Sequence, residues 1–126
     1  MQGDNNSVNI SSNVTFDQNV LLVVCEGTRV DIGEDCIFAN GVTIRTSDQH
    51  AIYNNDNMRI NKAKNVKIGN HVWLGAHVIV MKGTEVGDGS VIGMNSMITK
   101  NIPINCIAVG TPAKPIKHNI HWNKKL

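Results

Sequence analysis

The chain has 126 residues, of which 41% are apolar, 17% charged and 4% aromatic, and this composition indicates one globular domain, residues 1–126, rather than a disordered chain. Its net charge of +2, without a basic run interleaved with aromatic residues, argues against nucleic-acid binding. No apolar stretch reaches the length of a membrane helix, and the polar start Met1–Asp4 is unlike a signal peptide, so we expect a cytoplasmic protein without membrane insertion.

An apolar residue, nearly always aliphatic, recurs at every sixth position from Val8 to Ile44, and the series resumes in phase at Ile68. The series comprises Val8, Val14, Val20, Ile32, Phe38, Ile44, Ile68, Leu74, Val80, Val86, Ile92, Ile98 and Ile104, with the polar Glu26 as the exception. A small or branched residue follows four positions later at Val24, Val30, Cys36, Val42, Val72, Val78, Thr84, Ser90 and Ser96.

A period of six fits neither an α-helix nor a long alternating strand. It predicts a three-sided prism in which each side takes one short strand and one turn, with the two recurring side chains pointing inward. Three hexapeptides would make one coil of about 18 residues, and the chain would stack roughly five or six coils. A β-sandwich would instead place turns at uneven spacings of about 8–12 residues.

Two segments interrupt the repeat. Residues 46–66 are polar, and their length preserves the period, so we expect a loop that protrudes from a continuous coil. After Pro103 the pattern ends, and residues 110–126 are expected to cap the last coil, for which a short helix is one candidate. At Glu26 the sequence leaves two alternatives: a bulge that turns the side chain outward, or a buried and paired carboxylate.

Several motifs resemble those of the hexapeptide-repeat acetyltransferases, within which the chain is similar to the maltose and galactoside O-acetyltransferases and to bacterial capsule and surface-polysaccharide O-acetyltransferases. The resemblance covers about residues 13–122 and implies an all-β, single-stranded left-handed parallel β-helix. It is carried by the segments Ile68–Gly75, Val91–Gly93, Thr99–Pro103, Gly110–Lys114, Ile44–His50 and Arg59–Asn61.

The resemblance places the catalytic base at His50, in the polar loop. Acetyl transfer to a hydroxyl needs a base near neutral pH, and imidazole titrates there. Asp48 would either orient this ring or form a turn. Asn19 aligns with a family asparagine that hydrogen-bonds the acceptor or the reacting centre across a subunit boundary, although this fold also uses many asparagines in turns.

The resemblance also implies a binding site for acetyl-coenzyme A. Trp73 is expected to point outward at a prism corner beside the thioester, and the Ala76 N–H to face its carbonyl as an oxyanion donor. Met94 stands where relatives carry a smaller residue, so its side chain would narrow the channel unless the contact is made by its backbone. The remaining residues of this path are Thr99 and Lys100, followed by Lys114 and Lys117 near the phosphates.

These assignments predict a homotrimer, because one prism offers a wall and parallel packing of three prisms makes clefts between subunits. His50 of one subunit would deprotonate a sugar or polysaccharide hydroxyl, which attacks the thioester held by the next. No serine or cysteine is placed for an acetyl-enzyme, which favours direct transfer.

Other classes stay open at this point. An amine acceptor, such as an amino-sugar or an antibiotic, would make the protein an N-acetyltransferase. His71 and His77 with a histidine of a neighbouring subunit would suit a zinc site like that of the carbonic anhydrases of this fold, although the cysteines Cys25, Cys36 and Cys106 lack metal-ligand spacing and we expect no metal. A non-catalytic β-helix module would keep the repeat and bind no coenzyme.

Overall fold

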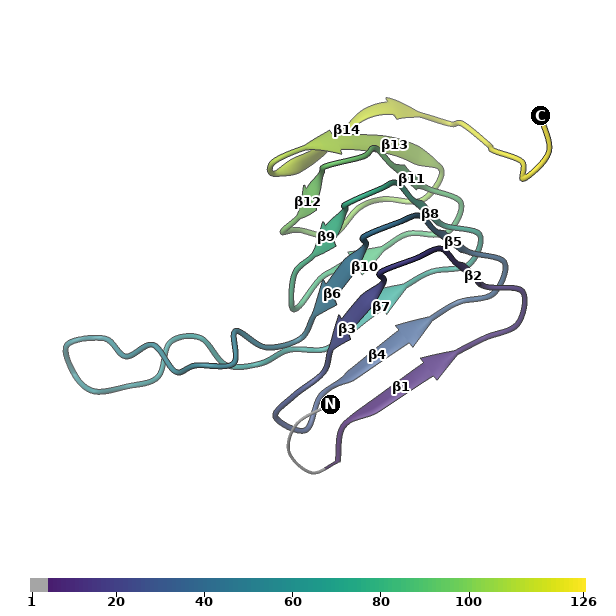
Figure 1. Cartoon of the computed structure of the whole chain (residues 1–126). Coiled ribbons are helices and arrows are strands. Elements are labelled where there is room, and N and C mark those ends of the chain that lie inside the picture. The colour runs from purple at the N-terminus through teal and green to yellow at the C-terminus, as the bar shows by residue number, and fades with distance from the viewer. Residues whose placement is uncertain (1–4) are drawn as a thin grey trace.

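The computed structural model describes residues 5–126, so the start on which the signal-peptide prediction rests lies outside the described residues. The described residues form a three-sided coil built only of strands and turns (Figure 1). None of them forms a helix long and apolar enough to cross a membrane. The described elements are all strands, and strands of successive coils pair in parallel, which confirms the predicted all-β parallel coil.

Each side of the coil is a sheet whose neighbouring strands come from successive coils. The first sheet contains β1 (Ser7–Ile10), β4 (Arg29–Ile32), β7 (Val66–Ile68) and β10 (Glu85–Val86). The second contains β2 (Thr15–Phe16), β5 (Ile37–Phe38), β8 (Trp73–Leu74), β11 (Val91–Ile92), β13 (Cys106–Gly110) and β14 (Ala113–His118). The third contains β3 (Leu21–Val23), β6 (Thr43–Arg45), β9 (Ile79–Val80) and β12 (Met97–Ile98).

The core is a stack of inward side chains in register from coil to coil. In the second sheet, Phe38 pairs with Leu74, Leu74 with Ile92 and Ile92 with Ala108, and each is at most 1% exposed. Small polar residues also lie in the interior, at places where their hydroxyl groups find hydrogen-bond partners. The hydroxyl of Ser90, for example, donates to the Pro103 carbonyl (2.6 Å) and accepts from the Cys106 N–H (3.1 Å).

The first coil is longer than the sequence pattern predicts. Val8 pairs with Val30, 22 residues on, whereas Lys67 pairs with Glu85, 18 residues on. The extra residues lie between β3 and β4, and they shift the phase of the repeat. The prediction that Val8, Val14 and Val20 are equivalent to Ile32 is therefore wrong, because they align with the smaller residues that begin at Val30.

This insertion also explains why the polar Glu26 interrupts the apolar series. The residue lies within the extra turn, has a left-handed backbone (φ +61°) and is exposed, so the outward alternative is the correct one.

At the other end of the coil, the prediction that Ile104 points inward is wrong. Its side chain is 61% exposed, and Ile102, which is 4% exposed and bridges to Val86, takes the inward place. The last turn is shorter, since Val91 pairs with Ile107, 16 residues on. The repeat then continues from Ile102 through the buried Cys106 and Ala108.

The C-terminal segment covers this end as a strand and not as a helix. β14 runs antiparallel to β13 and is the outermost strand of the second sheet, lying across the end of the coil in Figure 1. An antiparallel turn at Gly110–Ala113 lets the chain reverse and pair with its own last rung, which satisfies backbone groups that a helix would have left unpaired.

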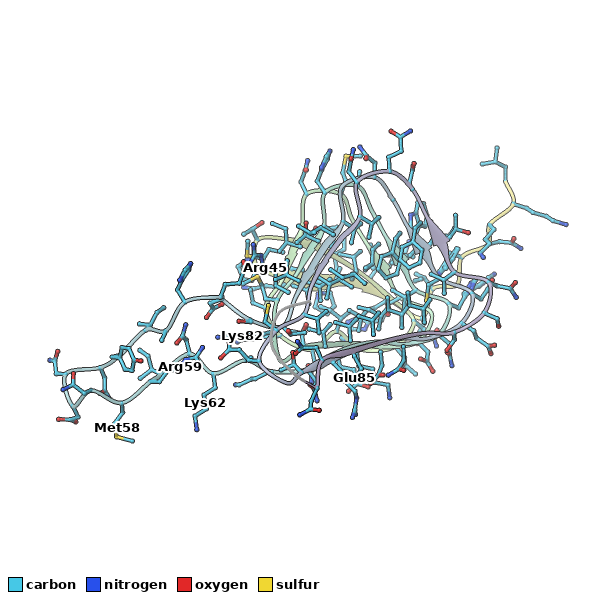
Figure 2. All side chains as sticks on the ribbon, turned by 60° about the horizontal axis from the view of Figure 1, so that its bottom comes forward. Arg45, Met58, Arg59, Lys62, Lys82 and Glu85 are labelled. Atoms are coloured by element: carbon cyan, nitrogen blue, oxygen red, sulfur yellow. The ribbon has the colours of Figure 1, made fainter. Side chains whose placement is uncertain are left out.

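Residues 46–65, which we call the arm, leave the coil between β6 and β7. Figure 2 shows the coil nearly end-on, with the arm extending from one corner, Met58 near its tip and Arg59 closer to the coil. The arm is a hairpin: Tyr53 and Arg59 form an antiparallel bridge, and the Ile60 N–H donates to the Ile52 carbonyl (2.9 Å). Below it the coil continues, since Val30 pairs directly with Val66.

Candidate active site

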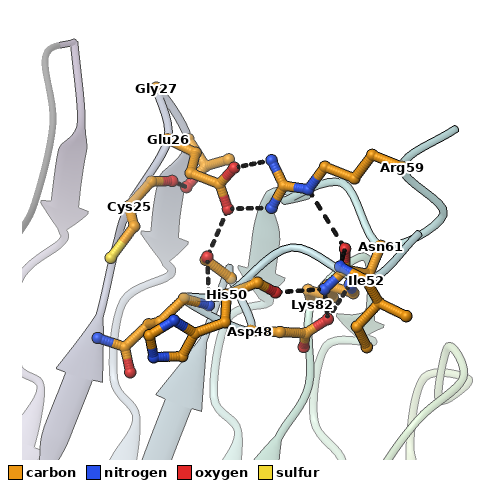
Figure 3. A network of polar contacts seen from close by, with 12 residues as sticks. Cys25, Glu26, Gly27, Asp48, His50, Ile52, Arg59, Asn61 and Lys82 are labelled. Atoms are coloured by element: carbon orange, nitrogen blue, oxygen red, sulfur yellow. Dashed lines mark hydrogen bonds and ion pairs between the residues drawn. The ribbon is translucent and has the colours of Figure 1, made fainter. Parts of the chain in front are cut away.

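The arm and the extra turn that contains Glu26 leave the same corner of the prism, in successive coils, and they are bonded to each other. The Arg59 guanidinium reaches the Glu26 carboxylate with both terminal nitrogens, one of them at 3.0 Å. The Ser47 hydroxyl donates to the same carboxylate (2.6 Å) and accepts from the Gln49 N–H (2.9 Å). The base of the arm is thus held by a fork-shaped ion pair (Figure 3).

A second ion pair ties the base of the arm to the wall of the next coil. The Lys82 ammonium lies 2.6 Å from Asp48 Oδ2, and the Asn61 amide donates to the same oxygen (3.0 Å). Lys82 first and Asn61 second lower the pKa of the Asp48 carboxyl. Among the described residues these are the contacts of the Asp48 carboxylate, so an orienting bond to the His50 ring is not part of this arrangement.

His50 lies at the base of the arm. Its side chain is exposed, and its backbone carbonyl accepts a hydrogen bond from the Asn61 amide (2.8 Å). An imidazole in this position is accessible to a substrate, while the main chain that carries it is fixed. That combination suits a general base, whose ring must meet a hydroxyl in a defined position.

A pocket of about 310 Å³ opens on the second sheet, at the carboxyl ends of its strands. Its walls are apolar, and they bring together three predicted coenzyme residues, Trp73, Ala76 and Met94. Gly75 is needed here, because a Cβ would lie 2.8 Å from the backbone of both Ile92 and Met94 in the next coil. The other lining residues are Ala39, Val91, Ile92 and Gly93.

Trp73 points outward as predicted, but from the flat side of the second sheet, between Ile37 and Val91, and not from a corner. It is 40% exposed. The Met94 side chain is 68% exposed at the rim of the pocket. An exposed, unbranched side chain at a rim can move aside, so Met94 does not close the pocket.

The other predicted site residues are spread over the prism. Lys114 and Lys117 are exposed on β14, in the same sheet as the pocket. Thr99 and Lys100 follow β12 and lie at the corner between the third and first sheets. Asn19 occupies the corner between the second and third sheets with φ +61°, where its amide donates to the Asn40 side chain of the next coil (3.3 Å).

Comparison with known proteins identifies the family. The bacterial transferase hexapeptide model (six repeats) matches residues 65–100. The polysialic acid O-acetyltransferase of Escherichia coli O1:K1 / APEC is 41% identical over 101 residues, covering 79% of this chain and 33% of that protein. The galactoside O-acetyltransferase of Escherichia coli strain K12 is 35% identical, covering 86% of this chain and 54% of that protein.

Solved structures agree over almost the whole chain. The polysialic acid O-acetyltransferase OatWY matches with a TM-score of 0.92 and 37% identity, covering 99% of this chain and 60% of that one. A maltose O-acetyltransferase from Clostridium difficile 630 matches with a TM-score of 0.65 and 30% identity, covering 97% of this chain and 70% of that one. The chain belongs to the hexapeptide-repeat acetyltransferase family. It spans about a third to a half of the length of the curated relatives named above.

The chain has a further cluster that the sequence did not reveal. The ring of Trp122 stacks on His71 (centroids 3.8 Å apart) and lies 5.8 Å from Trp73. His71 places Nδ1 2.7 Å from Asp35 and Nε2 2.9 Å from the Trp122 carbonyl. A zinc site that used His71 would have to replace both contacts, which weakens the carbonic-anhydrase alternative.

The sequence pattern also did not identify Arg59, Asn61 and Lys82 as residues of the arm base. The available signal was Glu26, the polar member of an otherwise apolar series. A lone carboxylate in such a series indicates an unusual local environment. It does not indicate which cation lies opposite, since Arg59 is 33 residues away along the chain.

The bond to Arg59, and then that to Ser47, lower the pKa of Glu26 from its usual 4.5 to about 2. Because the folded-state pKa is the lower one, this carboxylate stabilises the fold above about pH 4.5 and loses that contribution as the pH falls toward 2. In Glu26→Gln we therefore expect the urea midpoint to fall less steeply between pH 5 and 2 than in the unmodified protein. Glu34→Gln, which removes an exposed carboxylate at another turn, is the matched control, and equal slopes in all three proteins would contradict the prediction.

Proposed function

We propose that the protein transfers an acetyl group from acetyl-coenzyme A to a hydroxyl of a sugar or surface polysaccharide, with His50 as general base. The proposal is carried by one observation, the exposed imidazole of His50 on a main chain that the arm base holds in place. The names of the relatives support the reaction class, since those proteins are O-acetyltransferases of polysialic acid, galactosides and maltose.

The residues present fit acetyl-coenzyme A. The apolar pocket beside Trp73 suits the uncharged pantetheine arm, and the exposed ammonium groups of Lys114 and Lys117 stand in the same sheet for the phosphates. Acetyl-coenzyme A supplies the activated acetyl thioester. Lys100 and Thr99 lie at another corner of the prism and would reach the coenzyme from a neighbouring chain.

The reaction follows from the chemistry of these groups. His50 accepts the proton of the acceptor hydroxyl as its oxygen bonds to the thioester carbonyl carbon, and the Ala76 N–H donates to the developing oxyanion. Loss of the coenzyme thiolate completes the ester, and the protonated His50 returns the proton to the sulfur. Asn19 would hold the acceptor through its amide.

We infer that the working unit is a homotrimer, because His50 and the pocket lie at different corners of one prism with the third sheet between them. The outward side chains support this packing. Those of the first sheet are polar, whereas those of the second and third sheets are mostly apolar, with Thr15, Thr43 and Arg45 as polar members. The polar set includes Asn9, Asp31, Lys67 and Glu85, and the apolar set includes Ile37, Trp73, Val91, Leu21, Ile79 and Met97.

The arm supports association as well, because it carries apolar side chains that one chain leaves more than half exposed. They are Ile52, Tyr53, Met58 and Ile60. Sedimentation of the protein tests the inference directly, and a monomer that acetylates at full rate would overturn it.

The function itself is tested by acetyl transfer from acetyl-coenzyme A to a panel of acceptors. Polysialic acid, galactosides and maltose represent the hydroxyl class, and amino-sugars represent the amine class. Ester formation on a panel sugar, together with a coenzyme A-induced rise in the melting temperature, is the expected result. Transfer to amines alone would favour the N-acetyltransferase, and no response to coenzyme A would favour a non-catalytic module.

Lys114→Gln and Lys117→Gln should raise the KM for acetyl-coenzyme A by about 3–10-fold and leave kcat nearly unchanged, because each removes an exposed charge–phosphate contact that acts equally before and during reaction. Raising the ionic strength should likewise raise the KM of the unmodified protein for acetyl-coenzyme A. Lys125→Gln, in the exposed tail, is the matched control. A KM unchanged in both variants would remove these lysines from the coenzyme site.

A further inference from the structure

The side chain of Asn61 has every hydrogen-bonding position occupied. Its Oδ1 accepts from the Ile52 N–H (2.8 Å) and from Arg59 Nε (3.2 Å). Its Nδ2 donates to the His50 carbonyl (2.8 Å) and to Asp48 Oδ2 (3.0 Å). The residue is only 7% exposed, although the arm around it is largely exposed. A primary amide offers two donors and two acceptor lone pairs, and all four are used here.

The partners of this amide belong to both limbs of the arm. Asp48, His50 and Ile52 lie on the outgoing limb, whereas Arg59 and Asn61 itself lie on the returning limb. The bonds to His50 and Ile52 go to main-chain atoms on both sides of Ala51. One side chain therefore fixes the main chain of His50, the predicted general base, and of the two residues that follow it (Figure 3).

The amide is in turn anchored to two coils of the prism. Arg59 is paired with Glu26, in the turn after β3, and Asp48 is paired with Lys82, in the turn after β9. The base of the arm is therefore anchored at two points, one in each of two coils. A fully satisfied polar network of this kind is rigid, and leaving one member unpaired is costly.

We propose that Asn61 is a positioning residue for acetyl transfer: its amide holds the main chain of His50 so that the exposed ring meets the acceptor hydroxyl. The inference rests on the proposed function, since it concerns the base of that same reaction. Asn61 does not contact the reacting atoms. It acts through the His50 carbonyl, 2.8 Å away.

Asn61→Ala should lower kcat by about 10–100-fold and leave the KM for acetyl-coenzyme A within about twofold, because displacement of a catalytic group by about 1 Å can cost 10²-fold in rate while the coenzyme pocket is on another sheet. Asn54→Ala is the matched control. Asn54 also caps backbone N–H groups of the arm, those of Asp56 (2.9 Å) and Met58 (3.0 Å), but at the tip. Its loss should leave kcat within about twofold.

An exchange of two side chains separates positioning from folding. Asn61→Asp alone places a carboxylate against Asp48 and the His50 carbonyl, so both stability and kcat should fall. Asp48→Asn combined with Asn61→Asp restores one amide and one carboxylate beside Lys82, but an aspartate at 61 cannot donate to the His50 carbonyl. We expect the double variant to regain the part of the urea midpoint that was lost through repulsion between the two carboxylates, and to keep the low kcat.

The outcomes decide between the two proposals. Recovery of kcat in the double variant, or normal kcat in Asn61→Ala while His50→Ala is inactive, would overturn the positioning role and leave the function standing. Normal turnover of His50→Ala would instead refute His50 as the general base, whereas the absence of acetyl transfer by the unmodified protein to every acceptor of the panel would refute the function. The His50 ring proton resonances give an independent readout: they should shift and broaden in Asn61→Ala and not in Asn54→Ala, and unchanged resonances in both would count against the positioning role.

Discussion

His50→Ala should lower kcat for acetyl transfer by about 10²–10⁴-fold and leave the KM for acetyl-coenzyme A nearly unchanged. The imidazole is exposed at the base of the arm, whereas the apolar pocket lies on the second sheet. Its removal takes away the base and not a coenzyme contact. Initial rates measured with an acceptor selected from the panel, at saturating and limiting acetyl-coenzyme A, separate the two parameters.

His121→Ala is the control for this experiment, because it deletes an exposed imidazole in the C-terminal tail. It should turn over at the rate of the unmodified protein. If His50→Ala kept more than about a tenth of the rate at every pH, general-base catalysis by His50 would be wrong, since such bases contribute at least about 10²-fold.

Phe38→Ala should lower the free energy of unfolding by about 3–5 kcal/mol, the largest stability effect expected of a single substitution in this chain. Phe38 is fully buried, and its ring lies against that of Phe16 (centroids 4.9 Å apart) and in register with Leu74 of the next coil. The neighbouring coils are held by strand pairing on both sides, so they cannot collapse into the space that the ring leaves.

Urea unfolding of both proteins at the same protein concentration measures this loss while the contribution of association is held constant. Phe16→Ala is the matched control, because the Phe16 side chain is 39% exposed on the terminal coil and has less buried surface to lose. Equal losses in the two variants, or a loss below about 1 kcal/mol in Phe38→Ala, would show that the second coil is not tightly packed.

The two experiments examine different properties of the same prism. Phe38 contributes to the stacking that keeps successive coils in register, and the arm base depends on that register because its anchors come from different coils. A variant that loosens the stack should therefore also loosen the position of His50. A kcat measured for Phe38→Ala under conditions where the protein is folded reports on this dependence.

Much of the fold follows from local sequence. An inward aliphatic residue at every sixth position can be buried on all three sides only if the chain turns after each short strand, and residues such as Leu74, Ile92 and Ile98 are buried as predicted. The polar run after Ile44 cannot lie in an apolar wall. Its exclusion from the coil, and with it the place of His50, follow from its composition.

Only the tertiary structure decided the register at the two ends and the contacts at the arm base. Val8 and Ile104 both fit the period of six. Because of the four added residues before β4, however, Val8 aligns with Val30 instead of Ile32, and because of the shortened turn before Ile102, Ile104 points outward. The bond between Glu26 and Arg59 joins residues 33 positions apart, and the packing of two turns at one corner brings them together. Periodicity describes which way a side chain faces within its own coil, whereas ion pairs and pockets depend on how different coils are superimposed.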